Sequence, residues 1–143
     1  MEIDIVRSRG DFGDEHLVAD AERIYLADSE RDVPLSMVEE AAQHRNLFVA
    51  YDDDTPAALS VVTRFFERPF LSLLIVRKEW RRKGVANLLL DTIEEATAPS
   101  RLFTSTNKSN KAMQTLLERR GYVRRGEVDG LDPEDAEIFL SLR

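Results

Sequence analysis

A nearly unbroken apolar segment near the middle of the chain constrains the fold more than any other feature. It runs from Phe70 to Val76 and contains one polar residue, Ser72. Seven residues is a usual length for a strand and is short for a buried helix, and a strand without polar alternation is covered on both faces. The preceding Glu67–Arg68–Pro69 breaks the pattern before it. We therefore expect a central strand in a sheet with helices on both sides.

The rest of the chain supplies neighbours for this strand. Apolar runs predict further strands at residues 2–7, 47–51, 57–66, 102–106, 122–128 and 137–142, and helical spacing predicts helices from 14, near 36, from 85 to about 99 and over 110–120. Ser36 and Glu39 have capping-box spacing, and Gly121 lies where a helix stop belongs. Asp52 to Pro56 is a strong turn signal. No linker or repeat appears, so we expect one mixed α/β (α+β) domain over residues 1–143.

Composition excludes several classes of function. The absence of cysteine excludes a disulfide scaffold, a thiolate metal site and a cysteine nucleophile. No segment approaches the roughly 18 to 20 apolar residues that cross a bilayer, and the first residues do not form a signal peptide. His16 and His44 lie outside any ligand cluster, so we expect no metal. We expect a cytoplasmic protein that binds no membrane.

Charge is distributed unevenly along the chain. The net charge is −7, whereas residues 77–83, the basic segment, carry +4, so the remainder carries −11. Such a balance disfavours nucleic acid as a partner, because the acidic remainder would repel a long polyanion. It favours one small anionic ligand at the basic segment.

The basic segment separates the central strand from a helix that begins near Gly84 and Val85. The first turn of a helix leaves backbone N–H groups unpaired and carries a partial positive charge, which suits a diphosphate. Gly84 lets phosphate oxygens approach the backbone, and Arg81, Arg82 and Lys83 can add charge-assisted hydrogen bonds. A solvated turn is the alternative interpretation. Two facts favour the ligand: cations at a helix N-terminus oppose its dipole, and sheets of this class bind ligands at the carboxyl ends of strands.

Two motifs resemble the GNAT superfamily of N-acetyltransferases. Residues 81–86 resemble the Arg/Gln-x-x-Gly-x-Gly/Ala signature that follows the family's fourth strand and binds acetyl-CoA. Residues 109–112, followed by Leu116, Glu118 and Gly121-Tyr122, resemble the family's Asn-x-x-Ala…Leu-Tyr-Glu…Gly-Phe helix. The resemblance is to small bacterial members. It implies a central mixed, mostly antiparallel sheet that is splayed between strands 4 and 5 and flanked by about four helices.

The resemblance also implies an activity. The chain would transfer an acetyl group from acetyl-CoA, its cosubstrate, to a primary amine of a small molecule or peptide by direct attack on the thioester. Backbone groups of Ile75 and Val76 would pair with the pantetheine arm, and Asn107 and Asn110 would contact the coenzyme from its second side. The pyrophosphate would lie on the amides of Arg81, Arg82, Lys83, Gly84, Val85 and Ala86. A homodimer is one possible assembly.

The catalytic acid and base are less defined. Leu117 stands where many relatives have a tyrosine acid, and Ser72 stands where many have a glutamate base. Three alternatives remain: a thiol that leaves without an acid, Glu67 acting as a base through water, or a module that binds the coenzyme without fast chemistry. Tyr122 matches the aromatic of the Gly-Phe pair, where packing is its expected role and proton donation the alternative.

Two acidic segments bear on the acceptor. A negative rim would attract a cationic amine such as a polyamine, an aminoglycoside, a lysine side chain or a peptide N-terminus, although acidic loops also serve solubility alone. A third interpretation, an interaction domain without a coenzyme, is disfavoured by the same charges. The acidic residues are Asp28, Glu30, Asp32, Asp129, Asp132, Glu134 and Asp135.

Overall fold

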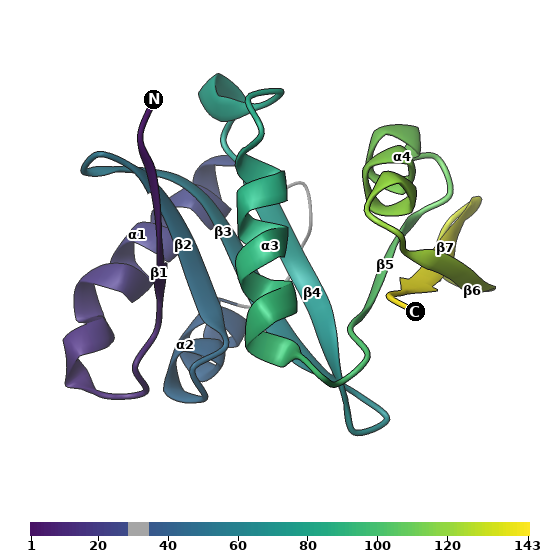
Figure 1. The fold of residues 1–143 in the computed structure, drawn as a ribbon, viewed down its shortest axis with the longest axis horizontal. Helices are drawn as coiled ribbons and strands as arrows, with labels where there is room; N and C mark the ends of the chain where they lie inside the picture. The colour runs from purple at the N-terminus through teal and green to yellow at the C-terminus, as the bar shows by residue number, and fades with distance from the viewer. Residues whose placement is uncertain (29–34) are drawn as a thin grey trace. The chain divides into compact units, whose positions relative to one another are not determined.

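The computed structural model describes residues 1–28 and 35–143, which form two compact units (Figure 1). Unit 1 comprises Met1–Thr63 and Ser72–Ala96, and unit 2 comprises Arg64–Leu71 and Thr97–Arg143. The described residues contain seven strands and four α-helices in the order that the sequence predicts. None of these helices is both long and apolar enough to cross a bilayer.

The strands pair in the order β1-β2-β3-β4-β5-β7-β6. Each pair with a described register is antiparallel except β4 with β5, which is parallel. The expected mixed, mostly antiparallel sheet is therefore confirmed. The strands are β1 (Ile3–Arg7), β2 (Leu47–Asp52), β3 (Thr55–Phe65), β4 (Arg68–Val76), β5 (Phe103–Asn107), β6 (Val123–Asp132) and β7 (Asp135–Ser141).

Unit 1 buries its main core between helices and one face of the strands. The helices α1 (Glu15–Asp28) and α2 (Ser36–Gln43) pack against residues that alternate along β2 to β4, because alternate residues of a strand point to the same face. The helix α3 (Val85–Thr97) crosses the other face in Figure 1. The core residues from the strands are Leu47, Val49, Leu59, Val61, Leu73 and Ile75.

Unit 2 holds the helix α4 (Lys111–Arg119), which ends as the sequence predicts. Gly121 has a φ of +92°, its N–H donates to the Glu118 carbonyl, and the Tyr122 N–H donates to the Leu117 carbonyl. These two bonds form a Schellman motif, in which glycine takes the left-handed position. The parallel ladder between β4 and β5 joins only two residue pairs, Phe70–Leu71 with Phe103–Thr104.

Two local expectations are corrected. The capping box at Ser36 and Glu39 does not form: Ser36 is the first residue of α2, Leu35 occupies the N-cap, and no side chain caps the helix. The strand expected from residue 70 begins at Arg68, because the turn before it occupies only Phe66 and Glu67, which have φ of +48° and +67°. Positive φ at both positions is the geometry of a tight hairpin turn.

Candidate functional site

The start of the basic segment is fixed to the β2–β3 hairpin within unit 1. The Arg77 N–H donates to the Ala57 carbonyl over 2.9 Å, and the Arg77 guanidinium donates to the Pro56 carbonyl over 3.2 Å. The guanidinium carbon lies 5.5 Å from the centre of the Trp80 ring. The Trp80 indole N–H in turn donates to Asp52 over 2.9 Å. Arg77 and Trp80 therefore position the segment against the β2–β3 hairpin.

The hydrogen bond from Trp80 changes the pKa of the Asp52 carboxyl that accepts it. The hydrogen bond from Trp80 lowers the pKa of Asp52 below its ordinary value, while partial desolvation acts in the opposite direction. The positive charge of Lys83 also lowers this pKa. Asp52 is therefore ionised at neutral pH and holds the turn through a charge-assisted bond.

The end of the basic segment exposes its backbone. Arg82 has a φ of +62° and Gly84 a φ of +84°, both in the left-handed region. A Cβ at Gly84 would meet no heavy atom within 4 Å, so the space beside this residue is open. Glycine is favoured here by backbone conformation and leaves room for a ligand to approach. The Arg81 side chain is used locally, since its Nε donates to the Val76 carbonyl over 2.9 Å.

The helix α3 begins directly after this turn. Leu88 donates its N–H to the Gly84 carbonyl over 3.2 Å. The amides before Leu88 lie at the positions where a helix provides no acceptor, and the helix dipole adds positive potential there. Buried Val85 fixes the first turn of α3 to the core, whereas the side chains of Arg82 and Lys83 are exposed. This arrangement can bind a diphosphate through backbone N–H groups and two cations.

The predicted residues of β4 lie in the strand that leads to the turn. Ile75 is buried in the core of unit 1, and Val76 is half-buried with its carbonyl bonded to Arg81. The Ser72 hydroxyl shares a short hydrogen bond with the Thr63 hydroxyl. The strand therefore brings Ile75, Val76 and the turn together in unit 1, as the sequence predicts.

Asn107 and Asn110 lie close together in unit 2, because Asn107 ends β5 and Asn110 is the N-cap of α4. The Asn110 side chain caps α4 by accepting the Met113 N–H over 3.1 Å, and Asn107 donates to Asp132 over 2.8 Å. The Gln114 amide donates to both asparagine carbonyls, over 3.1 Å and 3.2 Å. Each side chain thus has a structural partner, and their contacts with the coenzyme stay a prediction.

The candidate catalytic residues have contrasting environments. Leu117 and Tyr122 are 1% and 3% exposed, respectively. Glu67 lies in the exposed turn between β3 and β4, 3.7 Å from the Arg64 guanidinium. Catalytic roles for Tyr122, Glu67 and Ser72 stay predictions.

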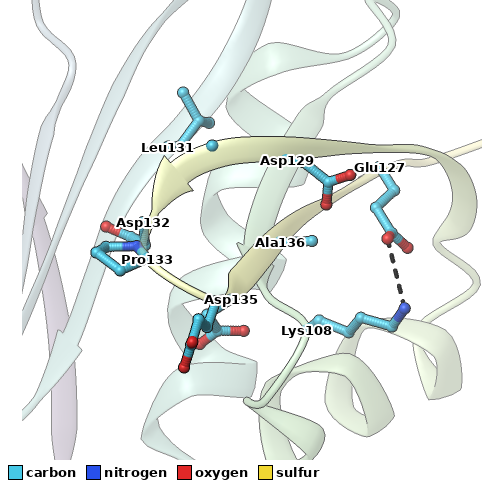
Figure 2. A pocket seen from close by; sticks show the side chains of 10 residues that line it. Lys108, Glu127, Asp129, Leu131, Asp132, Pro133, Asp135 and Ala136 are labelled. Carbon is cyan, nitrogen blue, oxygen red and sulfur yellow. Dashed lines mark hydrogen bonds and ion pairs between the residues drawn. The ribbon is translucent and has the colours of Figure 1, made fainter.

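The β6–β7 hairpin of unit 2 borders an acidic hollow of about 630 Å³ (Figure 2). Asp132 holds Asn107, Asp135 accepts from the Ser109 hydroxyl over 2.6 Å, and Lys108 lies 3.4 Å from Glu127. Of the other predicted acidic residues, Asp28 ends α1, and Glu30 and Asp32 lie outside the described residues. The lining comprises Lys108, Glu127, Asp129, Gly130, Leu131, Asp132, Pro133, Glu134, Asp135 and Ala136.

One buried carboxyl was not singled out by the sequence patterns. Glu137 on β7 is 7% exposed and accepts a hydrogen bond from the Ser105 hydroxyl over 2.6 Å. The available signal was an acidic residue beside the apolar run that begins at Ile138. In the part of the chain that the structure describes, no group of three or more His, Asp or Glu side chains is arranged to hold a metal ion.

Several solved structures share this fold. A GNAT-family acetyltransferase from Bacillus cereus matches with 24% identity and a TM-score of 0.87, covering 100% of this chain and 98% of that one. The ribosomal-protein-S18-alanine N-acetyltransferase of Escherichia coli matches with 16% identity and a TM-score of 0.84, covering 99% and 93%. Naa50 of Arabidopsis thaliana, solved with the bisubstrate analogue CoA-Ac-MVNAL, matches with 11% identity and a TM-score of 0.79, covering 100% and 99%.

No individual curated protein gives a significant match to this chain, whereas a family model does. Residues 20–130 match the model of the acetyltransferase (GNAT) domain. This range contains the basic segment, all of α3 and α4, both asparagines and the first part of β6. The chain therefore belongs to the GNAT family and is an N-acetyltransferase that uses an acyl-CoA donor.

Proposed function

We propose that this protein transfers the acetyl group of acetyl-CoA to a primary amine by direct attack of the amine nitrogen on the thioester carbon. The observation that carries the proposal is the open backbone from Arg82 to Ala86, with Gly84 at φ +84° and free space beside it. A diphosphate is the group of acetyl-CoA that best satisfies several amides at a helix start.

On the donor side, backbone amides of residues 81–86 bind the pyrophosphate, and Arg82 and Lys83 contribute charge. Backbone groups at Ile75 and Val76 pair with the pantetheine arm. Coenzyme contacts of Asn107 and Asn110 belong to the same proposal. When bound, acetyl-CoA supplies an activated acetyl group whose thiol is a good leaving group. The protein supplies position, a hydrogen bond to the carbonyl oxygen and a route for the proton of the amine.

On the acceptor side, we propose a cationic primary amine. The hollow beside the β6–β7 hairpin is lined by five carboxyl side chains and one lysine, which lies 3.4 Å from one of those carboxyls. This excess of negative charge raises the local concentration of cations. Two proteins of similar fold have peptide or protein acceptors in their names, so peptide N-termini belong in the tested panel.

A second candidate is a module that binds acyl-CoA without turnover. Leu117, in the position where many relatives carry a tyrosine acid, is 1% exposed and cannot donate a proton. This candidate shares the donor site and differs only in chemistry. We also propose that residues 1–143 act as one domain, which predicts a single cooperative unfolding transition.

The donor site is tested by thermal unfolding with CoA and with pantetheine, which lacks the diphosphate. A ligand that binds only the folded state raises its stability by RT ln(1 + [L]/Kd). We expect a clear rise in Tm with CoA and a much smaller one with pantetheine at equal concentration. Equal rises in Tm with the two ligands would show that the diphosphate does not contribute to binding.

Turnover is tested by release of free thiol from acetyl-CoA across a panel of amines. The panel contains spermidine, an aminoglycoside, a lysine-containing peptide with a blocked N-terminus and a peptide with a free N-terminus. We expect release above the hydrolysis background with at least one cationic amine. A rise in Tm with CoA, combined with no release from any amine, would instead establish the binding module.

A further inference from the structure

The buried Glu137 forms a polar pair with Ser105 that no part of the donor site uses. The two residues lie on neighbouring strands of unit 2, β7 and β5, which are adjacent in Figure 1. Glu137 Oε2 accepts the Ser105 hydroxyl over 2.6 Å. Within residues 1–28 and 35–143, no cation forms an ion pair with Glu137. A buried carboxylate is costly unless it is paired, so this one lacks a positive partner.

The surroundings of the pair suit a cation. In the β5–β7 register Ser105 lies opposite Phe139, and Asn107 lies opposite Glu137. Directly opposite residues of an antiparallel pair point to the same face, as do residues two apart on one strand. Ser105, Asn107, Glu137 and Phe139 therefore share one face, and all but Glu137 are only half-buried. The carboxyl thus lies beside a face that a ligand can reach.

Aromatic rings extend this face beyond Phe139. The Phe65 ring stacks on Phe139 with centroids 5.5 Å apart, and the Phe103 ring lies 5.9 Å from Phe65. Aromatic faces attract ammonium groups, and a carboxylate beside them adds direct charge attraction. A primary ammonium is small enough to contact both.

We propose that Glu137, oriented by Ser105, binds the ammonium form of the acceptor and removes its proton. The inference rests on the proposed amine acetylation. One proton of the ammonium moves to a Glu137 carboxylate oxygen and later to solvent. The neutral nitrogen attacks the thioester carbon, the C–N bond forms and the C–S bond breaks. The second proton lost by the nitrogen ends on the sulfur, which leaves CoA as a free thiol.

The charged groups near Glu137 set the expected pH behaviour. On its own strand, Asp135 points to the same face, and its carboxylate is bonded to Ser109. On β6, Val128 lies opposite Glu137, and Arg125 is bonded to the Ser141 hydroxyl two residues beyond Phe139. Asp132 also lies at the edge of this face, because it accepts a hydrogen bond from Asn107. Asp132 and Asp135 accept hydrogen bonds from Asn107 and Ser109, whereas Glu137 lies beside Phe139 and is bonded to Ser105, which makes Glu137 the carboxyl nearest the aromatic rings.

The test compares Glu137→Gln with Glu95→Gln, which removes the same charge from an exposed position near the end of α3. The pH dependence of kcat/KM separates a base from a structural residue, because free amine becomes abundant at high pH and needs no base. We expect Glu137→Gln to lose about 100-fold in kcat/KM near pH 7, within the range for general bases, and to approach wild type near pH 10. The kcat/KM of Glu95→Gln should stay at the wild-type value, and the CoA-induced rise in Tm should be the same in both variants.

A second readout needs no turnover. Calorimetric titration of the coenzyme-free protein with n-butylammonium chloride should show at least tenfold weaker binding for Glu137→Gln than for Glu95→Gln. Equal behaviour of the two variants in both measurements, or a pH-independent loss of activity in Glu137→Gln, would overturn the inference and leave amine acetylation standing. If the wild type released no thiol with any amine, both the role of Glu137 and the proposed amine acetylation would be contradicted.

Discussion

Replacing Gly84 by alanine tests the donor site with a control that the chain itself supplies. Gly84 and Gly121 have φ of +84° and +92°, and a methyl group at either position meets no heavy atom within 4 Å. Left-handed backbone costs an L-residue about 1–2 kcal/mol, so both variants should lose about the same stability without ligand. For a chain of this size the loss corresponds to about 3–6 °C in Tm. Only the methyl at Gly84 lies beside the proposed diphosphate.

The two variants should differ once CoA is added. Loss of one hydrogen bond to a charged phosphate group costs about 1.5–3 kcal/mol, which raises Kd about ten- to hundredfold. At a CoA concentration of about 100 times the wild-type Kd, stabilisation should fall from about 2.7 kcal/mol to between about 0.4 and 1.4 kcal/mol in Gly84→Ala. Differential scanning fluorimetry over a CoA series measures this. An equal CoA-dependent rise in Tm for Gly84→Ala and Gly121→Ala would refute the assignment of the turn.

Three further outcomes follow from single features of the structure. Ser60→Ala should raise stability by about 1 kcal/mol, or about 3 °C in Tm, because the Ser60 hydroxyl is fully buried without a hydrogen-bond partner; a lower Tm would contradict this. The pKa of Asp52 is lowered by its bond from Trp80, so its stabilising effect is complete above the unfolded pKa of about 3.9 and is lost as pH falls through the folded value. The difference in Tm between wild type and Asp52→Asn should therefore be constant above about pH 5 and shrink as the pH falls below about 4; a constant difference down to pH 2.5 would contradict this. The KM for a cationic acceptor should rise with ionic strength, because salt screens the charges of the acidic hollow. A KM that does not change with ionic strength would indicate that the acceptor binds outside this hollow.

The turn proposed as the donor site could be located from the sequence because the signals that define it are local. A strand end, a helix start and a glycine lie within about ten residues, and each has its own sequence signal. Local signals failed where neighbours compete: Ser36 and Glu39 have the spacing of a capping box, yet Leu35 occupies the N-cap. The left-handed φ of Arg82 was also unpredictable, since non-glycine residues adopt it only where the surrounding structure demands it.

The residues proposed for the acceptor side could not be found from the sequence, because their contacts join positions that are far apart in the chain. Ser105 and Glu137 are 32 positions apart, and their contact depends on the register in which Thr106 lies opposite Ile138. A shift of one residue in that register would turn Glu137 to the other face of the sheet. No local pattern specifies such a register. Glu137 therefore looked like an ordinary residue at the start of a strand.

If Glu137 is the base, this contrast would explain how the chain can transfer an acetyl group without the acid and base that many relatives carry. Diphosphate binding relies on backbone N–H groups, which every residue other than proline has, so its position is tied to one turn and one glycine. Proton transfer needs one carboxyl near the amine, and any strand that borders the same face can supply it. Ser72 on β4 and Leu117 on α4 are therefore compatible with catalysis when β7 contributes Glu137. The donor site should accordingly tolerate few substitutions at Gly84, whereas the base depends on the sheet register that brings β7 beside β5.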